Sequence, residues 1–121
     1  MEEDIETAKY ILSESGKKEQ FFSNKALQVI AYAMEKDAEK EGQRLFDNDF
    51  IFAPFGPYNP VIYKHWEKVM ILPWWEESTS GKKELVDKLL PRYVPLKAPL
   101  YELAERIRKE QRHVATSPDK L

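Results

Sequence analysis

Hydrophobic residues recur at intervals of three and four positions along most of the chain, which is the spacing of one face of an α-helix. The clearest case lies between Ser23 and Gly42. This pattern predicts a helix over 23–41 that is capped by Ser23, ends at Gly42 and buries Leu27, Ile30 and Met34. The charged residues that follow Met34 in this helix are expected to face water: Glu35, Lys36, Asp37, Glu39 and Lys40.

Further segments show the same periodicity next to residues that start or stop helices. Asp4 is expected to cap the first helix, which stops at Gly16, and Asn59 followed by Pro60 is expected to cap another. The ranges predicted for these helices are 4–15, 60–71, 82–90 and 99–111. The core residues expected on them are Ile62, Trp66, Leu103 and Ile107.

The period changes in the middle of the chain. An Asp-Asn-Asp turn at 47–49 precedes the apolar run 50–53, which predicts one short strand or extended segment. Pro54, Gly56 and Pro57 then force a bend, because proline fixes φ and glycine tolerates a positive φ. We therefore expect Gly56 to have a positive φ or to lie against another backbone.

Together these elements predict a mainly α fold, a compact single domain of about five helices with at most one short strand or hairpin. The chain has 121 residues, which fits one hydrophobic core. The helical domain is expected to cover residues 1–112. Residues 113–121 lack periodicity and include Ser117-Pro118, so we expect a mobile C-terminal tail there.

Composition narrows the classes of function. The sequence has no cysteine, which excludes disulfides and thiolate metal sites, and its formal net charge of -2 gives no positive excess for binding phosphates. Acidic residues near the N-terminus and the short apolar runs predict neither a signal peptide nor a membrane-spanning helix. We therefore expect a cytoplasmic protein with no membrane partner.

No pattern of residues indicates catalysis or metal binding. His65 and His113 have no partner at the helical spacing of a metal pair. Asp47, Asn48 and Asp49 lack the alternating ligands and the distant glutamate of a calcium loop. No serine has a Gly-x-Ser-x-Gly context, and no glycine-rich phosphate loop occurs. We expect no enzymatic activity, no catalytic residue, no metal and no cofactor.

Aromatic residues are concentrated in the middle of the chain, where nine fall within 30 positions. Such side chains are enriched in interface hot spots, although packing of the third helix on the second would also explain most of them. Trp74 and Trp75 follow Pro73, where the chain turns, so at least one is expected to be exposed. The candidate protein-binding residues are Phe55, Gly56, Pro57, Tyr58, Trp74 and Trp75.

Four short motifs occur in a fixed order between Ile5 and Tyr63. They are Ala8-Lys9-Tyr10-Ile11-Leu12, Ser23-Asn24-Lys25-Ala26-Leu27-Gln28, Arg44-Leu45-Phe46 and Phe55-Gly56-Pro57-Tyr58-Asn59-Pro60-Val61-Ile62-Tyr63. This ordered set resembles the Panacea domain family, also described as SocA-like antitoxins or phage-associated proteins. The last motif is similar to the family's aromatic-Gly-Pro-x-x-Pro-x-x-Tyr pattern, from which Tyr58 departs because valine often follows Gly-Pro.

The resemblance implies the antitoxin of a toxin–antitoxin system, a helical domain that neutralises a cognate toxin by direct binding or hands it to a protease. It does not identify the toxin. The alternative function is a helical nucleic-acid-binding transcriptional regulator, because the last predicted helix carries Arg106, Arg108, Lys109 and Arg112. Three acids on the same helix reduce the positive potential that this alternative needs: Glu102, Glu105 and Glu110. We therefore expect a protein partner rather than nucleic acid.

Overall fold

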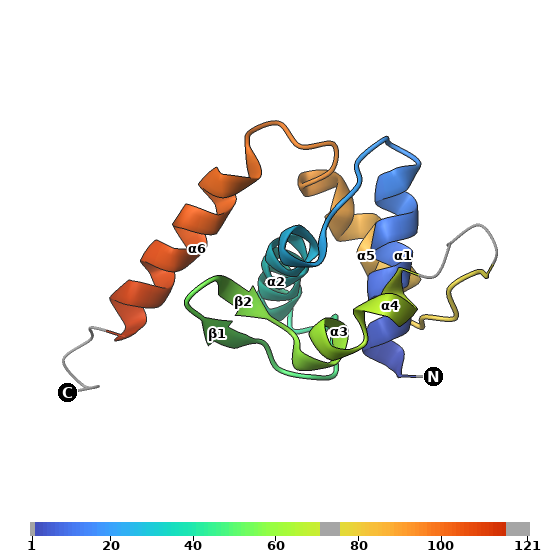
Figure 1. Ribbon diagram of the computed structural model, residues 1–121, viewed down its shortest axis with the longest axis horizontal. Helices are drawn as coiled ribbons and strands as arrows, with labels where there is room; N and C mark the ends of the chain where they lie inside the picture. The colour runs from blue at the N-terminus through green and yellow to red at the C-terminus, as the bar shows by residue number, and fades with distance from the viewer. Residues whose placement is uncertain (1, 71–75, 116–121) are drawn as a thin grey trace.

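The computed structural model describes residues 2–70 and 76–115, and the side chains of 2–70 and 76–110. These residues form six α-helices, one 3-10 helix and a two-stranded hairpin, which confirms the predicted mainly α fold (Figure 1). The helices are α1 Glu3–Gly16, α2 Asn24–Lys40, α3 Pro60–Lys64, α4 Trp66–Val69, α5 Lys83–Leu89 and α6 Leu100–Ala115, with the 3-10 helix η1 Leu90–Arg92 directly after α5.

The central element is α2, on which α1, α5, α6 and the hairpin pack (Figure 1). Leu27, Ile30 and Met34 are fully buried on it, as the periodicity predicts, and Ile62 joins them from α3. Three other predicted core residues are further out: Ile107 is buried, whereas Trp66 and Leu103 are only partly buried against the core.

Two predicted helix caps are confirmed. The Ser23 hydroxyl accepts a hydrogen bond from the Ala26 N–H at 3.2 Å and begins α2. The Asn59 side chain accepts from the Val61 N–H at 3.0 Å, and Pro60 follows it at the first position of α3. Both caps depend only on neighbouring residues, which is why the sequence predicts them.

Two predictions about α1 are wrong. Glu2, rather than Asp4, is the residue at the N-cap, and Asp4 lies inside the helix. At the other end the helix includes Gly16, and Glu19 is the residue with a left-handed φ of 60°. The Gln20 N–H donates to the Ser15 carbonyl across this turn, so a non-glycine residue closes the helix.

Two further boundaries and one face differ from prediction. The segment predicted as one helix over 60–71 divides at His65, whose φ of -113° and ψ of 36° interrupt the helical backbone between α3 and α4. The last helix continues to Ala115, into the segment predicted as a tail. Glu35, expected in water, is buried because its carboxylate caps the backbone of a neighbouring loop.

The middle of the chain forms a hairpin. The sequence predicts one short strand or extended segment there, with a hairpin as the upper limit. Strands β1 Ile51–Ala53 and β2 Gly56–Tyr58 are antiparallel, with Ile51 opposite Tyr58. Gly56 has a φ of +123°, so the predicted positive φ is confirmed, and no atom lies within 4 Å of where its Cβ would be. Glycine is therefore favoured here by the positive φ of the turn and not by close neighbouring atoms.

A helix that crosses a bilayer needs a long and apolar segment, which sets a requirement for the described helices. None of those in residues 2–70 and 76–115 is both long and apolar enough to cross a membrane.

Candidate functional site

A buried carboxylate on α1 fixes the position of the middle of the chain. Asp4 is fully buried, and its two oxygens accept hydrogen bonds from the backbone N–H groups of Asp47 at 2.7 Å and Asn48 at 2.9 Å. The side-chain amides of Asn48 and Asn59 donate to the same carboxylate at 2.9 and 3.0 Å. These four bonds hold the loop before the hairpin, and the start of α3, on the first turn of α1.

The Asn59 backbone is fixed from the other side by α2. Its N–H donates to the Gln28 side-chain oxygen at 2.7 Å, and the Gln28 amide donates to Asn24 at 3.1 Å. Asn59 is fully buried and thus links α1, α2 and α3. The end of the hairpin is therefore held rigidly where the chain enters α3.

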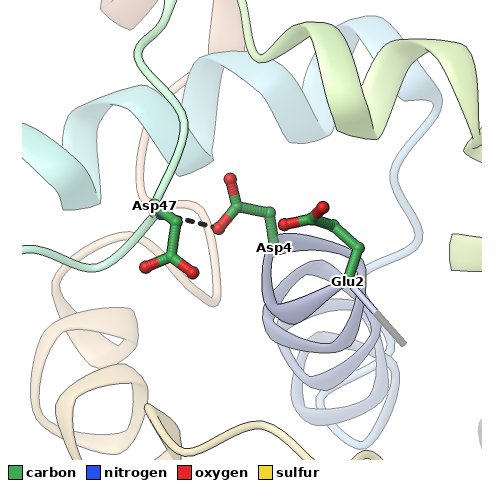
Figure 2. A group of neighbouring side chains, drawn as sticks. All are labelled: Glu2, Asp4 and Asp47. Carbon is green, nitrogen blue, oxygen red and sulfur yellow. Dashed lines mark hydrogen bonds between the residues drawn. The ribbon is translucent and has the colours of Figure 1, made fainter.

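The carboxylates of Glu2, Asp4 and Asp47 have oxygens within 4.8 Å of one another (Figure 2). In Figure 2 the backbone N–H of Asp47 faces Asp4, and the dashed line marks its hydrogen bond to the Asp4 carboxylate. Asp4 already accepts hydrogen bonds from four N–H donors, three of them at Oδ2. The contacts of this cluster serve to hold the loop on α1.

Three aromatic rings meet on the surface beside Asn59. They belong to Phe55, Tyr58 and Tyr63, which we name the aromatic corner. Their ring centroids are 5.5 Å apart for Phe55 and Tyr58, 5.4 Å for Tyr58 and Tyr63, and 6.1 Å for Phe55 and Tyr63. Phe55 is 44% exposed and Tyr63 is 53% exposed. The hairpin turn, β2 and α3 each contribute one ring.

The structure places the predicted site residues in different environments. Phe55 is exposed and Tyr58 is half-buried, whereas Gly56 and Pro57 are buried and shape the hairpin. The pair Trp74 and Trp75 lies outside the described residues, so the predicted exposure of one tryptophan stays a prediction.

Sequence reasoning missed Tyr63 as a site residue, although this residue ends the motif that begins at Phe55. The signal for including it is its position four residues after the helix cap Asn59, which returns its ring toward the hairpin. Ile51, directly opposite Tyr58 in the hairpin and 47% exposed, extends the apolar surface.

Other aromatic rings of the middle segment contact one another or Tyr32 on α2. Tyr32 on α2 makes edge-to-face contacts with Phe50 and Phe52, at centroid distances of 5.5 and 5.1 Å. Phe46 contacts Phe50 in the same way at 5.5 Å. Packing thus explains part of the aromatic excess, but the element that these rings wedge against α2 is the hairpin and not the third helix.

The last helix carries charges of both signs. Arg106, Arg108 and Lys109 are exposed, and the Arg108 guanidinium lies 2.7 Å from the Glu105 carboxylate. The side chain of Arg112 lies outside the described side chains. The described part of α6 is therefore a mixed surface rather than a continuous basic one.

Comparison with protein-family models, with curated proteins and with solved structures finds no match for this chain. The resemblance to the Panacea domain accordingly depends on the four motifs, their order and their spacing.

Proposed function

We propose that this protein is an antitoxin-like protein-binding domain, which neutralises a cognate toxin by direct binding through the aromatic corner. The observation that carries the proposal is the contact of three partly exposed rings, those of Phe55, Tyr58 and Tyr63, on one surface. A patch of this kind is typical of a binding site for another protein.

The support beneath the aromatic corner favours binding. Asn59 lies next to Tyr58. It donates hydrogen bonds to α1 and α2 and accepts one from α3. The rings are therefore already held near one another before a partner arrives, and less conformational entropy is lost on association. Tyrosine and phenylalanine also bury large areas for only two rotatable side-chain bonds.

The resemblance to the Panacea domain supports a toxin as the partner. The aromatic corner coincides with its most specific motif, which runs from Phe55 to Tyr63. Neutralisation by masking would require only that the corner cover part of the toxin surface. The alternative function, a nucleic-acid-binding regulator, has weaker support because Glu105 neutralises Arg108 on the last helix.

Co-expression with the product of the adjacent gene tests the proposal. The wild-type chain should relieve growth arrest caused by that product and should co-purify with it. Phe55→Ala and Tyr63→Ala should each weaken binding by about 2 kcal/mol or more, the usual threshold of a hot spot. Their melting temperatures should stay close to that of the wild type, because neither side chain belongs to the buried core.

Phe21→Ala is the matched control. Phe21 is 82% exposed and lies in the connector between α1 and α2, away from the hairpin in the chain. This variant should bind and rescue like the wild type. An adjacent product that is not toxic, or a toxin that is neither rescued nor bound, would refute the antitoxin function. Equal loss of binding in the control would refute the role of the aromatic corner.

A further inference from the structure

A second candidate site lies on the inner side of the hairpin, where a pocket of about 290 Å³ opens between α2 and β1. Tyr32, Phe50 and Phe52 form its aromatic wall, and Glu35 lies among them on α2. We name this the Glu35 pocket. It is separate from the aromatic corner, whose rings are not among its lining residues.

Glu35 has one oxygen in use and one free of hydrogen bonds. Its side chain is 5% exposed, and Oε2 accepts from the backbone N–H groups of Phe46 at 2.7 Å and Leu45 at 3.1 Å. Oε1 is buried and receives no hydrogen bond from the described residues. The nearest cationic atom is Arg44 Nε at 3.7 Å, which is beyond hydrogen-bonding distance.

The two basic residues at the pocket donate their hydrogen bonds to acids other than Glu35, although Arg44 Nε also forms an ion pair with Glu35 Oε1 at 3.7 Å. The Arg44 guanidinium donates to Asp49 at 2.9 Å, and the Lys36 ammonium donates to Glu39 at 3.0 Å. Three carboxylates and two cations therefore line the pocket, which leaves it with a formal charge of one negative unit when all are ionised. The acceptor that receives no hydrogen bond is the buried Oε1 atom of Glu35.

We propose that the Glu35 pocket binds the cationic side chain of an arginine or lysine presented by the partner protein. This inference rests on the proposed function for the partner protein that carries the side chain. The chemistry of the site does not depend on that function. A cation would replace Arg44 at Oε1, donate to this oxygen and lie against the ring of Phe52, which attracts positive charge through its face. The ring of Tyr32 already has the Lys36 ammonium 5.5 Å from its centroid.

Pocket size is compatible with a single side chain as the occupant. Sites for drug-sized ligands and cofactors have volumes of roughly 300 to 1,000 Å³. The Glu35 pocket, at about 290 Å³, lies just below this range. Arg44 borders the pocket and is half exposed, so it acts as a movable internal competitor of the incoming cation.

The test uses the purified full chain and two blocked amino acids, N-acetyl-arginine methylamide and its uncharged isostere N-acetyl-citrulline methylamide. Binding is followed by NMR at the amides of Leu45 and Phe46, which report on Glu35 directly. The arginine probe should shift both amides, and the citrulline probe should bind at least about tenfold more weakly, as expected for loss of a charge-assisted hydrogen bond.

Two substitutions should change this affinity in opposite directions. Glu35→Gln keeps an oxygen for the backbone N–H groups but removes the charge, and should weaken arginine binding about tenfold. Arg44→Met removes the competing cation and should strengthen it. Phe52→Leu should weaken binding without disturbing Glu35, and it keeps the test decisive if Glu35→Gln does not fold. Phe21→Ala should have no effect.

Equal binding of the two probes, or binding of neither, would overturn the proposal. Weaker binding in Arg44→Met would overturn it too, because that result would mean that Arg44 supports the bound probe instead of competing with it. None of these measurements requires the toxin, so failure here leaves the antitoxin function standing, and failure of toxin rescue leaves the Glu35 pocket standing.

Discussion

Asp4 and Asn59 are 55 positions apart in sequence, yet the Asn59 side-chain amide donates to the buried Asp4 carboxylate at 3.0 Å. This bond joins the first turn of α1 to the cap of α3. It sets the position of the hairpin end on which the aromatic corner depends, and it involves one of the few carboxylates that the fold buries completely.

Removal of the Asp4 carboxylate should strongly destabilise the fold. Asp4→Ala leaves part-buried donors from Asp47 and Asn48, and the buried amide of Asn59, without an acceptor, so we expect the free energy of unfolding to fall by about 3 kcal/mol or more. Urea unfolding monitored by circular dichroism measures this. Glu2→Ala is the control, since Glu2 is exposed and its contact to Asn48 is long at 3.4 Å. Comparable losses for both variants would contradict the assigned role of Asp4.

Two positions with positive φ should respond oppositely to substitution. Glu19→Gly relieves a side chain from a left-handed conformation at φ 60° and should stabilise the protein by about 0.5 to 1 kcal/mol. Gly42→Ala imposes such a conformation at φ 73° and should destabilise it by about 1 kcal/mol. Thermal and urea unfolding test both. Destabilisation by Glu19→Gly would show that another residue closes α1.

Gly56→Ala should cost about 1 to 3 kcal/mol of stability, because a φ of +123° is unfavourable for any residue with a Cβ. Open space around this position makes backbone strain the only cause. Gly81→Ala serves as control: its φ is not in the positive range and its Cβ would meet Glu3 Oε1 at an ordinary 3.8 Å. Unchanged stability in Gly56→Ala would mean that the hairpin turn relaxes without loss.

Truncation of core residues should distinguish full from partial burial. Ile30→Ala removes a fully buried side chain and should lower the free energy of unfolding by about 2 to 5 kcal/mol. Leu103→Ala should cost less, because Leu103 is only partly buried against the core. Denaturant unfolding gives both values. Losses below about 1 kcal/mol at both positions would show that the helix faces are wrongly assigned.

Glu35 and Glu6 should make opposite contributions to the dependence of stability on pH. Burial raises the pKa of Glu35 above 4.5 and outweighs its hydrogen bonds from Phe46 and Leu45. Burial opposes ionisation of Glu6 as well, but the Thr79 N–H and the Lys9 ammonium outweigh it and lower the pKa of Glu6 below 4.5.

The sign follows from linkage. Glu35 contributes stability below pH 4.5 that is lost as pH rises through its folded pKa, so the wild type should lose stability relative to Glu35→Gln above pH 4.5. Glu6 contributes stability above pH 4.5 that is lost as pH falls, so the wild type should gain relative to Glu6→Gln as pH rises toward 4.5. Urea unfolding from pH 3 to 7 measures both differences. Parallel pH profiles for the two variants would contradict this assignment.

Sequence reasoning succeeds here where the interaction is local. The caps Ser23 and Asn59, the buried stripe of α2 and the positive φ of Gly56 each depend on residues within a few positions. It fails at Asp4 because the donors to that side chain begin 43 positions later. No periodic pattern distinguishes such a buried acid from a solvated one.

The same limit applies to the candidate sites. Glu35 stands in a charged run and is expected in water, but the loop that follows α2 returns its own N–H groups to the carboxylate. The aromatic excess is evident from composition, yet its division into an inner cluster at Tyr32 and an outer corner at Tyr63 depends on the hairpin register. That register is a property of the folded chain.

The wide separation between α1 and its hydrogen-bonding partners has a consequence for synthesis on the ribosome. Glu6 binds the Thr79 N–H 73 positions downstream, a distance that translation covers in roughly 4 to 15 s. Until then the Glu6 carboxylate stays hydrated, whereas the partners of Asp4 are synthesised earlier. Completion of the native core is therefore a late event, which follows the emergence of the loop that carries Ser78 and Ser80.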